Sequence, residues 1–278
     1  MGTPKRERQK ANRQLRLEEL ARQARTEKRK KTGLYLLLIP VGALVLIGLI
    51  KLVGSDDNTP ATATTTIDPN LPTTTLTPLP STIAGATLTG ETPCPAADGT
   101  SPRTITFGGP PPSCIDATKT YTAEVTTNKG AYTIELDAAA APLTVNNFVV
   151  LARYHYFDST ICHRAIPAFA VQCGDPTGTG SGGPGYEFAD ELPATGSYKV
   201  GSAAMANSGP DTNGSQFFII TGADGAALSP KYTLFGTVTD GLDTTVAALD
   251  ALGNSDQAAN GVPPLEQIIV QSVIITEA

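Results

Sequence analysis

The longest unbroken run of apolar residues lies near the start of the chain. Residues 33–53 hold a single charged side chain, Lys51, close to the end of the run. About 20 apolar residues span the hydrocarbon core of a bilayer, whereas the apolar part of a cleavable signal peptide has about 15 at most. No small-residue cleavage pattern follows the run directly. The run therefore predicts an uncleaved transmembrane helix.

From residue 119 onwards, apolar and polar positions alternate over short runs that are rich in β-branched and aromatic residues. This alternation is typical of half-buried β-strands. Residues 120–127 and 131–136 predict a β-hairpin because the turn sequence NKG separates them. A second hairpin is expected over residues 161–175, with its turn at IPA. Further strands are expected at residues 200–206, 216–220, 234–238 and 267–276.

Two stretches follow the helical period instead. Pro142 opens the first stretch, and proline is favoured at the first position of a helix. Apolar residues then recur at i, i+3, i+4 and i+7, which indicates one buried stripe: Val145, Phe148, Val149 and Ala152. Residues 242–252 predict the second helix, with Val246 and Leu249 facing the core. Many short strands with two helices indicate a mainly β fold, either a closed antiparallel barrel or a sandwich.

Charge changes the interpretation of the N-terminal region. Residues 1–32 carry twelve Lys or Arg and four Glu, whereas residues 33–278 carry eight Lys or Arg and twenty-two Asp or Glu. Basic residues next to a transmembrane helix stay on the cytoplasmic side, so the bulk of the chain is expected outside a cell membrane that it spans once. The orientation of the chain in the membrane already explains the basic charge of residues 1–32, and no nucleic-acid partner is expected.

The segment after the apolar run differs again. It is rich in Thr, Pro and Ala and has no apolar periodicity, which predicts a disordered, extended stalk. The sequence thus predicts five parts: a basic cytoplasmic tail (1–32), a transmembrane anchor (33–53), the stalk (54–90), a cysteine-bounded clasp (91–118) and a globular domain (119–278).

Four cysteines follow the predicted anchor, at Cys94, Cys114, Cys162 and Cys173. An even number outside the membrane favours disulfides, and the lack of a CxxC pair argues against a metal site. A Cys94–Cys114 bridge would close the clasp and contribute roughly 3 kcal/mol on the loop-entropy view. A hairpin turn centred between Pro167 and Ala168 would place Cys162 opposite Cys173, which predicts a second bridge. Other pairings of the four cysteines stay open.

The second hairpin carries the candidate chemistry. Arg164, Phe169 and Gln172 are spaced so that they can share one wall. A cationic donor beside an aromatic ring could bind a small hydrophobic group and polarise it. The sequence from 178 to 183 also satisfies GxGxxG, but Pro184 follows it instead of the helix that a phosphate site requires, so a nucleotide site is rejected.

Three motifs carry a family resemblance: HRAIPAFAVQCGDPTGTGSGGPGY, MANSGPDTNGSQFFI and LSPKYTLFGTV. Their order and spacing resemble those of cyclophilins, the peptidyl-prolyl cis-trans isomerases, over residues 119–278. With its anchor and stalk, the chain resembles membrane-anchored cyclophilins of Gram-positive, high-GC bacteria. The resemblance implies a closed eight-stranded antiparallel β-barrel capped by two α-helices.

The resemblance also implies a site and a substrate. It makes Arg164 catalytic, together with Phe169 and Gln172, and it implies substrate binding by Met205, Ala206, Asn207, Gln216, Phe218, Leu228 and Tyr232. The implied activity is cis-trans isomerisation of X-Pro bonds in extracytoplasmic proteins, with no cofactor and no metal. Ala227 stands where cyclosporin-sensitive members carry Trp, so weak cyclosporin binding is expected. The alternative is a proline-peptide-binding module or holdase with little turnover.

Overall fold

The computed structural model describes residues 84–278. The expected cytoplasmic tail and transmembrane anchor, and most of the expected stalk, lie outside these residues. Among the helices of residues 84–278, none combines the length and the apolar character that a bilayer span needs.

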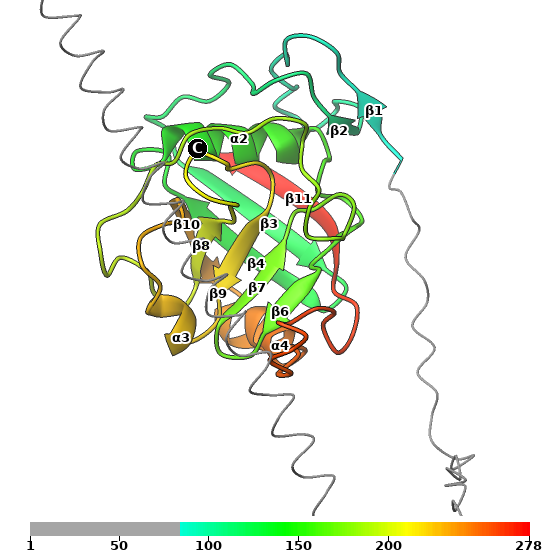
Figure 1. Ribbon diagram of the computed structural model, residues 1–278. Helices are drawn as coiled ribbons and strands as arrows, with labels where there is room; N and C mark the ends of the chain where they lie inside the picture. Colours follow the sequence, from blue (N-terminus) through cyan, green and yellow to red (C-terminus); the bar gives the residue numbers. More distant parts are fainter. Residues whose placement is uncertain (1–83) are drawn as a thin grey trace, which may run out of the picture. The chain divides into compact units, whose positions relative to one another are not determined.

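A nine-stranded antiparallel sheet forms the body of the described residues (Figure 1). In spatial order its strands are β5 (Thr160–Ile161), β11 (Ile269–Glu277), β3 (Tyr121–Thr127), β4 (Gly130–Leu136), β10 (Leu234–Asp240), β8 (Ser202–Met205), β9 (Phe217–Ile220), β7 (Ala170–Cys173) and β6 (Arg164–Ile166). Strands β5 and β6 lie at opposite ends of the sheet, yet only Cys162 and His163 separate them along the chain. Because the three steps from Ile161 to Arg164 span at most about 10 Å, the sheet must curl until its two ends nearly meet.

The structure corrects the expectation of a closed eight-stranded barrel. No ladder of strand pairs joins β5 to β6 within residues 84–278, and a single antiparallel bridge, between Ile161 and Asp175, crosses the gap between the two ends. The count is nine because one chain segment is interrupted at Cys162 and His163. Its first half pairs with β11, and its second half pairs with β7.

Both helical predictions find counterparts, at opposite ends of the curled sheet in Figure 1. Helix α2 (Pro142–Arg153) has the expected bounds. The second stretch begins with a π-helical turn, η1 (Leu242–Val246), and continues as α4 (Ala247–Asp250), with Val246 and Leu249 buried as predicted. A further short helix, α3 (Ala223–Ala226), had no sequence signal.

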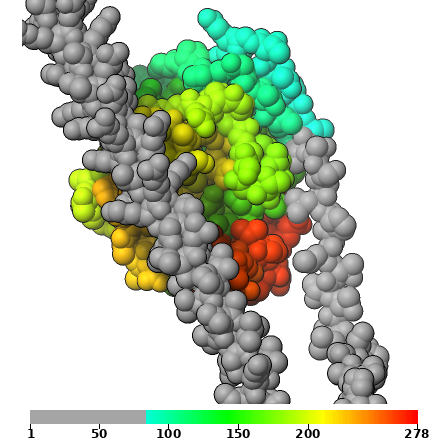
Figure 2. Space-filling view, in the orientation of Figure 1, coloured from blue at the N-terminus to red at the C-terminus, as the bar shows by residue number. Residues whose placement is uncertain are grey.

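The single buried stripe predicted for α2 was wrong, because every residue from Thr144 to Arg153 is buried. The clasp covers the outer face of the helix, and Figure 2 shows the cyan start of the clasp lying against the green part of the molecule. Asn146 of α2 connects the helix to the clasp by two hydrogen bonds. Its Oδ1 accepts from the backbone N–H of Cys114 at 2.7 Å, and its Nδ2 donates to the carbonyl of Pro112 at 2.8 Å. On the inner face, the ring of Phe148 lies 5.3 Å from that of Phe217.

Both expected disulfides, Cys94–Cys114 and Cys162–Cys173, are present. The first closes the clasp. A short parallel pair joins β2 (Thr104–Thr106), inside the clasp, to β1 (Ala86–Thr87), so the last residues of the expected disordered stalk form a strand against the clasp. The predicted register of the second hairpin was wrong by one residue. Arg164 pairs with Gln172 and Ile166 with Ala170, so the turn is centred on Ala168. Ala168 has a φ of 57°, and this left-handed residue creates a three-residue loop where the sequence had suggested two.

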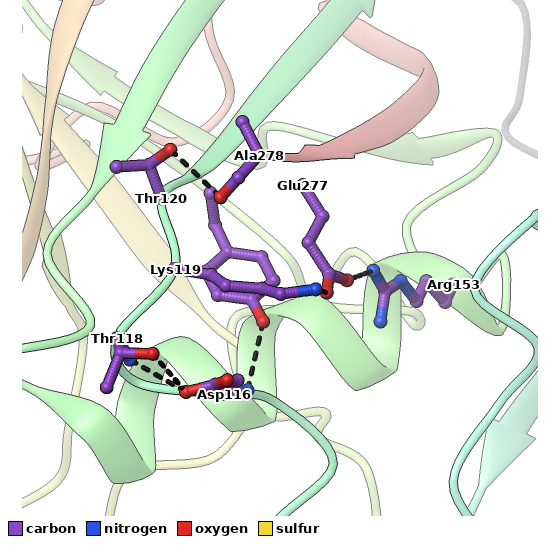
Figure 3. Close-up of polar contacts among 8 residues, drawn as sticks. Asp116, Thr118, Lys119, Thr120, Arg153, Glu277 and Ala278 are labelled. Atoms are coloured by element: carbon purple, nitrogen blue, oxygen red, sulfur yellow. Dashed lines mark hydrogen bonds and ion pairs between the residues drawn. The ribbon is translucent and has the colours of Figure 1, made fainter.

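The C-terminal end of the sheet is tied through charges to α2 and to Lys119, which lies just before β3 (Figure 3). Glu277 accepts from Lys119 Nζ at 2.7 Å and from Arg153 Nη2 at 2.6 Å. Arg153 lies in the last turn of α2 and its side chain is only 7% exposed, whereas that of Lys119 is 49% exposed. The Arg153 pair therefore carries most of the electrostatic stabilisation, since solvent screens the exposed pair.

We expect Glu277→Gln to lower the free energy of unfolding by about 1–2 kcal/mol, because it leaves a nearly buried guanidinium without its counter-charge. Urea denaturation followed by circular dichroism measures this loss. Lys119→Ala removes the exposed partner of the same carboxylate and serves as the matched control, with a much smaller shift of the midpoint. Equal shifts for the two variants would contradict the assignment.

Candidate active site

A chain of hydrogen bonds runs from β6 across the sheet to the glycine-rich loop. Arg164 and Gln172 are a cross-strand pair, so their side chains leave the sheet on the same face. Arg164 Nη1 donates to Gln172 Oε1 at 3.3 Å, and Gln172 Nε2 donates to Gln216 Oε1 at 2.9 Å. Gln216 Nε2 in turn donates to the carbonyls of Gly180, at 3.1 Å, and Gly182, at 3.0 Å. Each polar side chain is thereby fixed by its neighbour.

The other edge of the guanidinium is held by a residue far away in sequence. Arg164 Nε donates to the backbone carbonyl of Asn260 at 3.0 Å, and Nη2 donates to its Oδ1 at 3.0 Å. Arg164 Cζ also lies 5.7 Å from the centre of the Phe169 ring. Partial burial lowers the pKa of Arg164, but a guanidinium titrates so far above neutrality that the group stays charged.

A small apolar cluster lies beside this charge, on the face of the sheet opposite the main core. Side chains alternate along a strand, so Phe218 and Ala204 point to this face while Phe217 and Ala203 point into the core. The buried members are Ala170, Tyr198, Ala204, Phe218 and Ile220, and the partly buried members are Phe169, Ala206, Ala226, Leu228, Tyr232 and Leu234. The rings of Phe218 and Tyr232 meet edge to face, with centroids 5.4 Å apart.

The structure brings together most of the residues singled out from the sequence. Arg164, Phe169, Gln172, Gln216, Phe218, Leu228 and Tyr232 belong to the hydrogen-bond chain or to the apolar cluster. Met205 does not join them, because it is 1% exposed and packs in the main core. Asn207 Nδ2 donates to the carbonyl of Lys231 at 2.8 Å, which ties the second motif to the segment that carries Tyr232.

A cavity of about 510 Å³ adjoins the hydrogen-bond chain. Its walls include Gln172, Gln216, Ala206, Asn207 and the glycine-rich loop from Gly180 to Glu187. The glycine-rich loop therefore forms one wall of this cavity. The cavity is open and mostly polar in lining, and neither Arg164 nor Asn260 is among its lining residues.

Asp175 holds the glycine-rich loop in place. The residue is completely buried, and its carboxylate accepts from the backbone N–H groups of Thr177, at 2.7 Å, and Gly180, at 2.6 Å. A third N–H, of Gly182, donates to it at 3.0 Å. Burial by itself would raise the pKa of Asp175, but hydrogen bonds from the Thr177 side chain and from these backbone groups outweigh it and lower the pKa.

Two residues of the site escaped the sequence analysis. Asn260 lies in an irregular loop with no periodicity, and no motif marks it. Tyr198 is buried in the apolar cluster, where its hydroxyl donates to the carbonyl of Tyr232 at 2.6 Å and accepts from the N–H of Tyr232 at 3.1 Å. An isolated tyrosine between two predicted strands gave no signal, although a buried hydroxyl always needs a partner.

Comparison with known proteins identifies the family of this chain. Residues 122–275 match the family described as "Cyclophilin type peptidyl-prolyl cis-trans isomerase/CLD", and the chain belongs to this family. The "Probable peptidyl-prolyl cis-trans isomerase B" of Mycobacterium leprae is 39% identical over 172 residues, which cover 55% of this chain and 56% of that protein. "Peptidyl-prolyl cis-trans isomerase B" of Streptomyces anulatus is 40% identical over 169 residues, 55% of this chain and 95% of that protein.

The match to longer relatives is partial. "Peptidyl-prolyl cis-trans isomerase-like 2" of Cryptococcus neoformans is 43% identical over 161 residues, and the chain spans 27% of its length. Among solved structures, a cyclophilin-type isomerase of Cryptosporidium parvum is similar with a TM-score of 0.51 and 34% identity, covering 56% of this chain and 98% of that one. A second structure of the same protein, described as in the presence of the dipeptide Ala-Pro, has a TM-score of 0.50.

The depressed pKa of Asp175 predicts a pH dependence. A carboxylate whose pKa is lowered by folding stabilises the fold above its unfolded pKa of about 3.9, and this contribution is lost as the pH falls through the folded value. Asp175→Asn should therefore speed amide hydrogen exchange at Gly180 and Gly182 at pH 6, and should remove the additional loosening of the loop below about pH 4. Exposed Asp224→Asn is the control. Unchanged exchange at both glycines in Asp175→Asn would refute the anchoring role.

Proposed function

We propose that the chain catalyses cis-trans isomerisation of X-Pro peptide bonds. The observation that carries the proposal is a half-buried guanidinium, fixed on two sides, next to an apolar cluster that opens to the surface. Membership of the cyclophilin family supports it, and so do relatives about 40% identical that are named as isomerases.

The chemistry required is stabilisation of a twisted imide. The planar X-Pro bond is stiff because the nitrogen donates its lone pair into the carbonyl, and rotation crosses a barrier of about 18–20 kcal/mol. At the twisted state the lone pair is localised on nitrogen and can accept a hydrogen bond. A donor aimed at this nitrogen binds the twisted state better than either planar state, and only such differential binding lowers the barrier.

Arg164 is suited to supply that donor. Three of its N–H contacts go to Gln172 and Asn260, and the remaining N–H groups of the guanidinium have no hydrogen-bond partner within residues 84–278. The prolyl ring of the substrate would rest on Phe169, Phe218 and the neighbouring cluster. With the ring held there, rotation moves the carbonyl that precedes the proline, and we assign the Gln172 amide, which adjoins Arg164, the role of hydrogen-bonding that part of the peptide.

The partners we propose are proline-containing polypeptides, as the dipeptide in the Cryptosporidium parvum structure suggests. Cyclosporin binding should be weak. Ala227 is exposed at the end of α3 next to Leu228, and its methyl group offers a large ligand far less apolar area than an indole would.

We also propose that the isomerase domain works outside the cytoplasm. In this arrangement residues 1–32 lie in the cytoplasm, residues 33–53 cross the membrane once, residues 54–90 form the stalk, and the clasp (91–118) and the isomerase domain (119–278) follow outside. The support is the long apolar run flanked by basic residues, and the two disulfides, which are typical of oxidising compartments.

Arg164→Lys tests the catalytic proposal because lysine keeps the charge but loses the planar fork. In a coupled assay on an X-Pro peptide with the purified full chain, we expect kcat/KM to fall about 100-fold, the usual effect of removing an aimed donor. Lys199→Ala, an exposed substitution, should leave the rate unchanged. A wild-type rate equal to that of buffer would overturn the enzyme proposal, and peptide binding without turnover would favour the holdase alternative.

Protease treatment of intact cells tests the topology. With an epitope tag at each end of the chain, the C-terminal tag should be lost on external proteolysis while the N-terminal tag is protected until the membrane is permeabilised. Protection of both tags in intact cells would contradict an extracytoplasmic isomerase domain.

A further inference from the structure

Asn260 makes two contacts to one side chain, and that side chain is the charged group at the centre of the site. Its backbone carbonyl accepts from Arg164 Nε and its Oδ1 accepts from Arg164 Nη2, each at 3.0 Å. The two contacts clamp the guanidinium like a carboxylate fork, but they do so without a negative charge. A neutral clamp fixes the orientation of the cation without cancelling its charge, as a carboxylate would.

The loop that carries Asn260 is itself fixed to β6. The Ala165 N–H donates to the carbonyl of Gly261 at 3.0 Å, and the Asn254 N–H donates to the carbonyl of Ala165 at 2.9 Å. A Cβ at Gly261, whose φ is 79°, would lie 2.7 Å from the carbonyl oxygen of Ala165, so the loop approaches the strand as closely as glycine allows. Arg164 and its clamp are therefore parts of one hydrogen-bonded unit at the end of the sheet.

The backbone at Asn260 suits this residue type. Its φ is 51°, in the left-handed region where asparagine is far better tolerated than most residues. The Asn260 N–H donates to the carbonyl of Asp256 at 3.1 Å, which closes the turn that directs both of its oxygens toward Arg164. The residue is exposed, so burial in the core does not explain its geometry.

We propose that Asn260 is a positioning residue for the isomerisation: it clamps one edge of the Arg164 guanidinium so that the free N–H groups stay aimed at the imide nitrogen of the substrate. This inference rests on the proposed isomerase function. A free arginine side chain samples many rotamers, and a donor that must find its orientation during rotation of the substrate loses part of its effect. Binding of the prolyl ring depends on the apolar cluster, so the clamp acts on kcat and leaves KM nearly unchanged.

Asn260→Gly is the test, because glycine keeps the positive φ and the backbone carbonyl but removes the side chain, and with it the Oδ1 contact to Arg164. We expect kcat to fall about tenfold, equivalent to about 1.4 kcal/mol, with KM within about twofold of wild type. Ser159→Gly is the matched control: Ser159 also has a positive φ (60°), is exposed and lies outside the site. It should leave both constants unchanged, which accounts for any general effect of a more flexible chain.

Nitrogen-15 NMR of the Arg164 guanidinium supplies a readout that a purely structural role would not move. Rotation about the Nε–Cζ bond should be faster in Asn260→Gly than in wild type, and slow again in Asn260→Asp, which restores an acceptor oxygen. An unchanged kcat in Asn260→Gly, or a loss that appears only in KM, would overturn the positioning role. A wild-type protein without isomerase activity would instead overturn the proposed function. The rates of Nε–Cζ rotation would still show whether Asn260 restrains the guanidinium.

Discussion

The structure depends on the place where the two ends of the curled sheet come together. Cys162 and His163 alone connect β5, at one end, to β6, at the other, so the curl of all nine strands is constrained by a two-residue link. The Cys162–Cys173 disulfide ties this link to β7. Arg164 follows the link directly, and Gln172 directly precedes the second cysteine. The pair that carries the proposed chemistry is thus bracketed by the covalent bond that stabilises the junction.

A charge that is half removed from water requires acceptors, and this requirement organises the rest of the site. Arg164 finds them in Asn260 and Gln172, and Gln172 then needs Gln216, which is held by the carbonyls of Gly180 and Gly182. The amides of the same two glycines bond Asp175. One continuous polar network therefore runs from an irregular loop, through β6, β7 and Gln216 just before β9, to the glycine-rich loop. The apolar cluster lies beside it on the same outer face.

Much of this could be predicted from the sequence, and the failures have physical reasons. Helix α2 and the first hairpin have nearly the bounds that their apolar periodicity predicts. The register of the second hairpin depends on the left-handed conformation of Ala168, which cannot be predicted from an alanine in the sequence. Membership of a motif says nothing about which face a residue takes, and Met205 turned inward between two outward alanines. Asn260 lies 96 residues from Arg164, and such a contact leaves no local pattern. The burial of the outer face of α2 required the clasp to fold over it.

The most direct test of the account is two-dimensional exchange NMR of an X-Pro peptide mixed with a small amount of the full chain. We predict exchange cross-peaks between the cis and trans forms of the peptide at mixing times at which the peptide alone shows none, because uncatalysed rotation takes tens of seconds. With Arg164→Ala, the peptide signals should still broaden from binding, but the cross-peaks should disappear. Broadening without cross-peaks in the wild-type chain would contradict the claim that the fixed guanidinium stabilises a twisted imide.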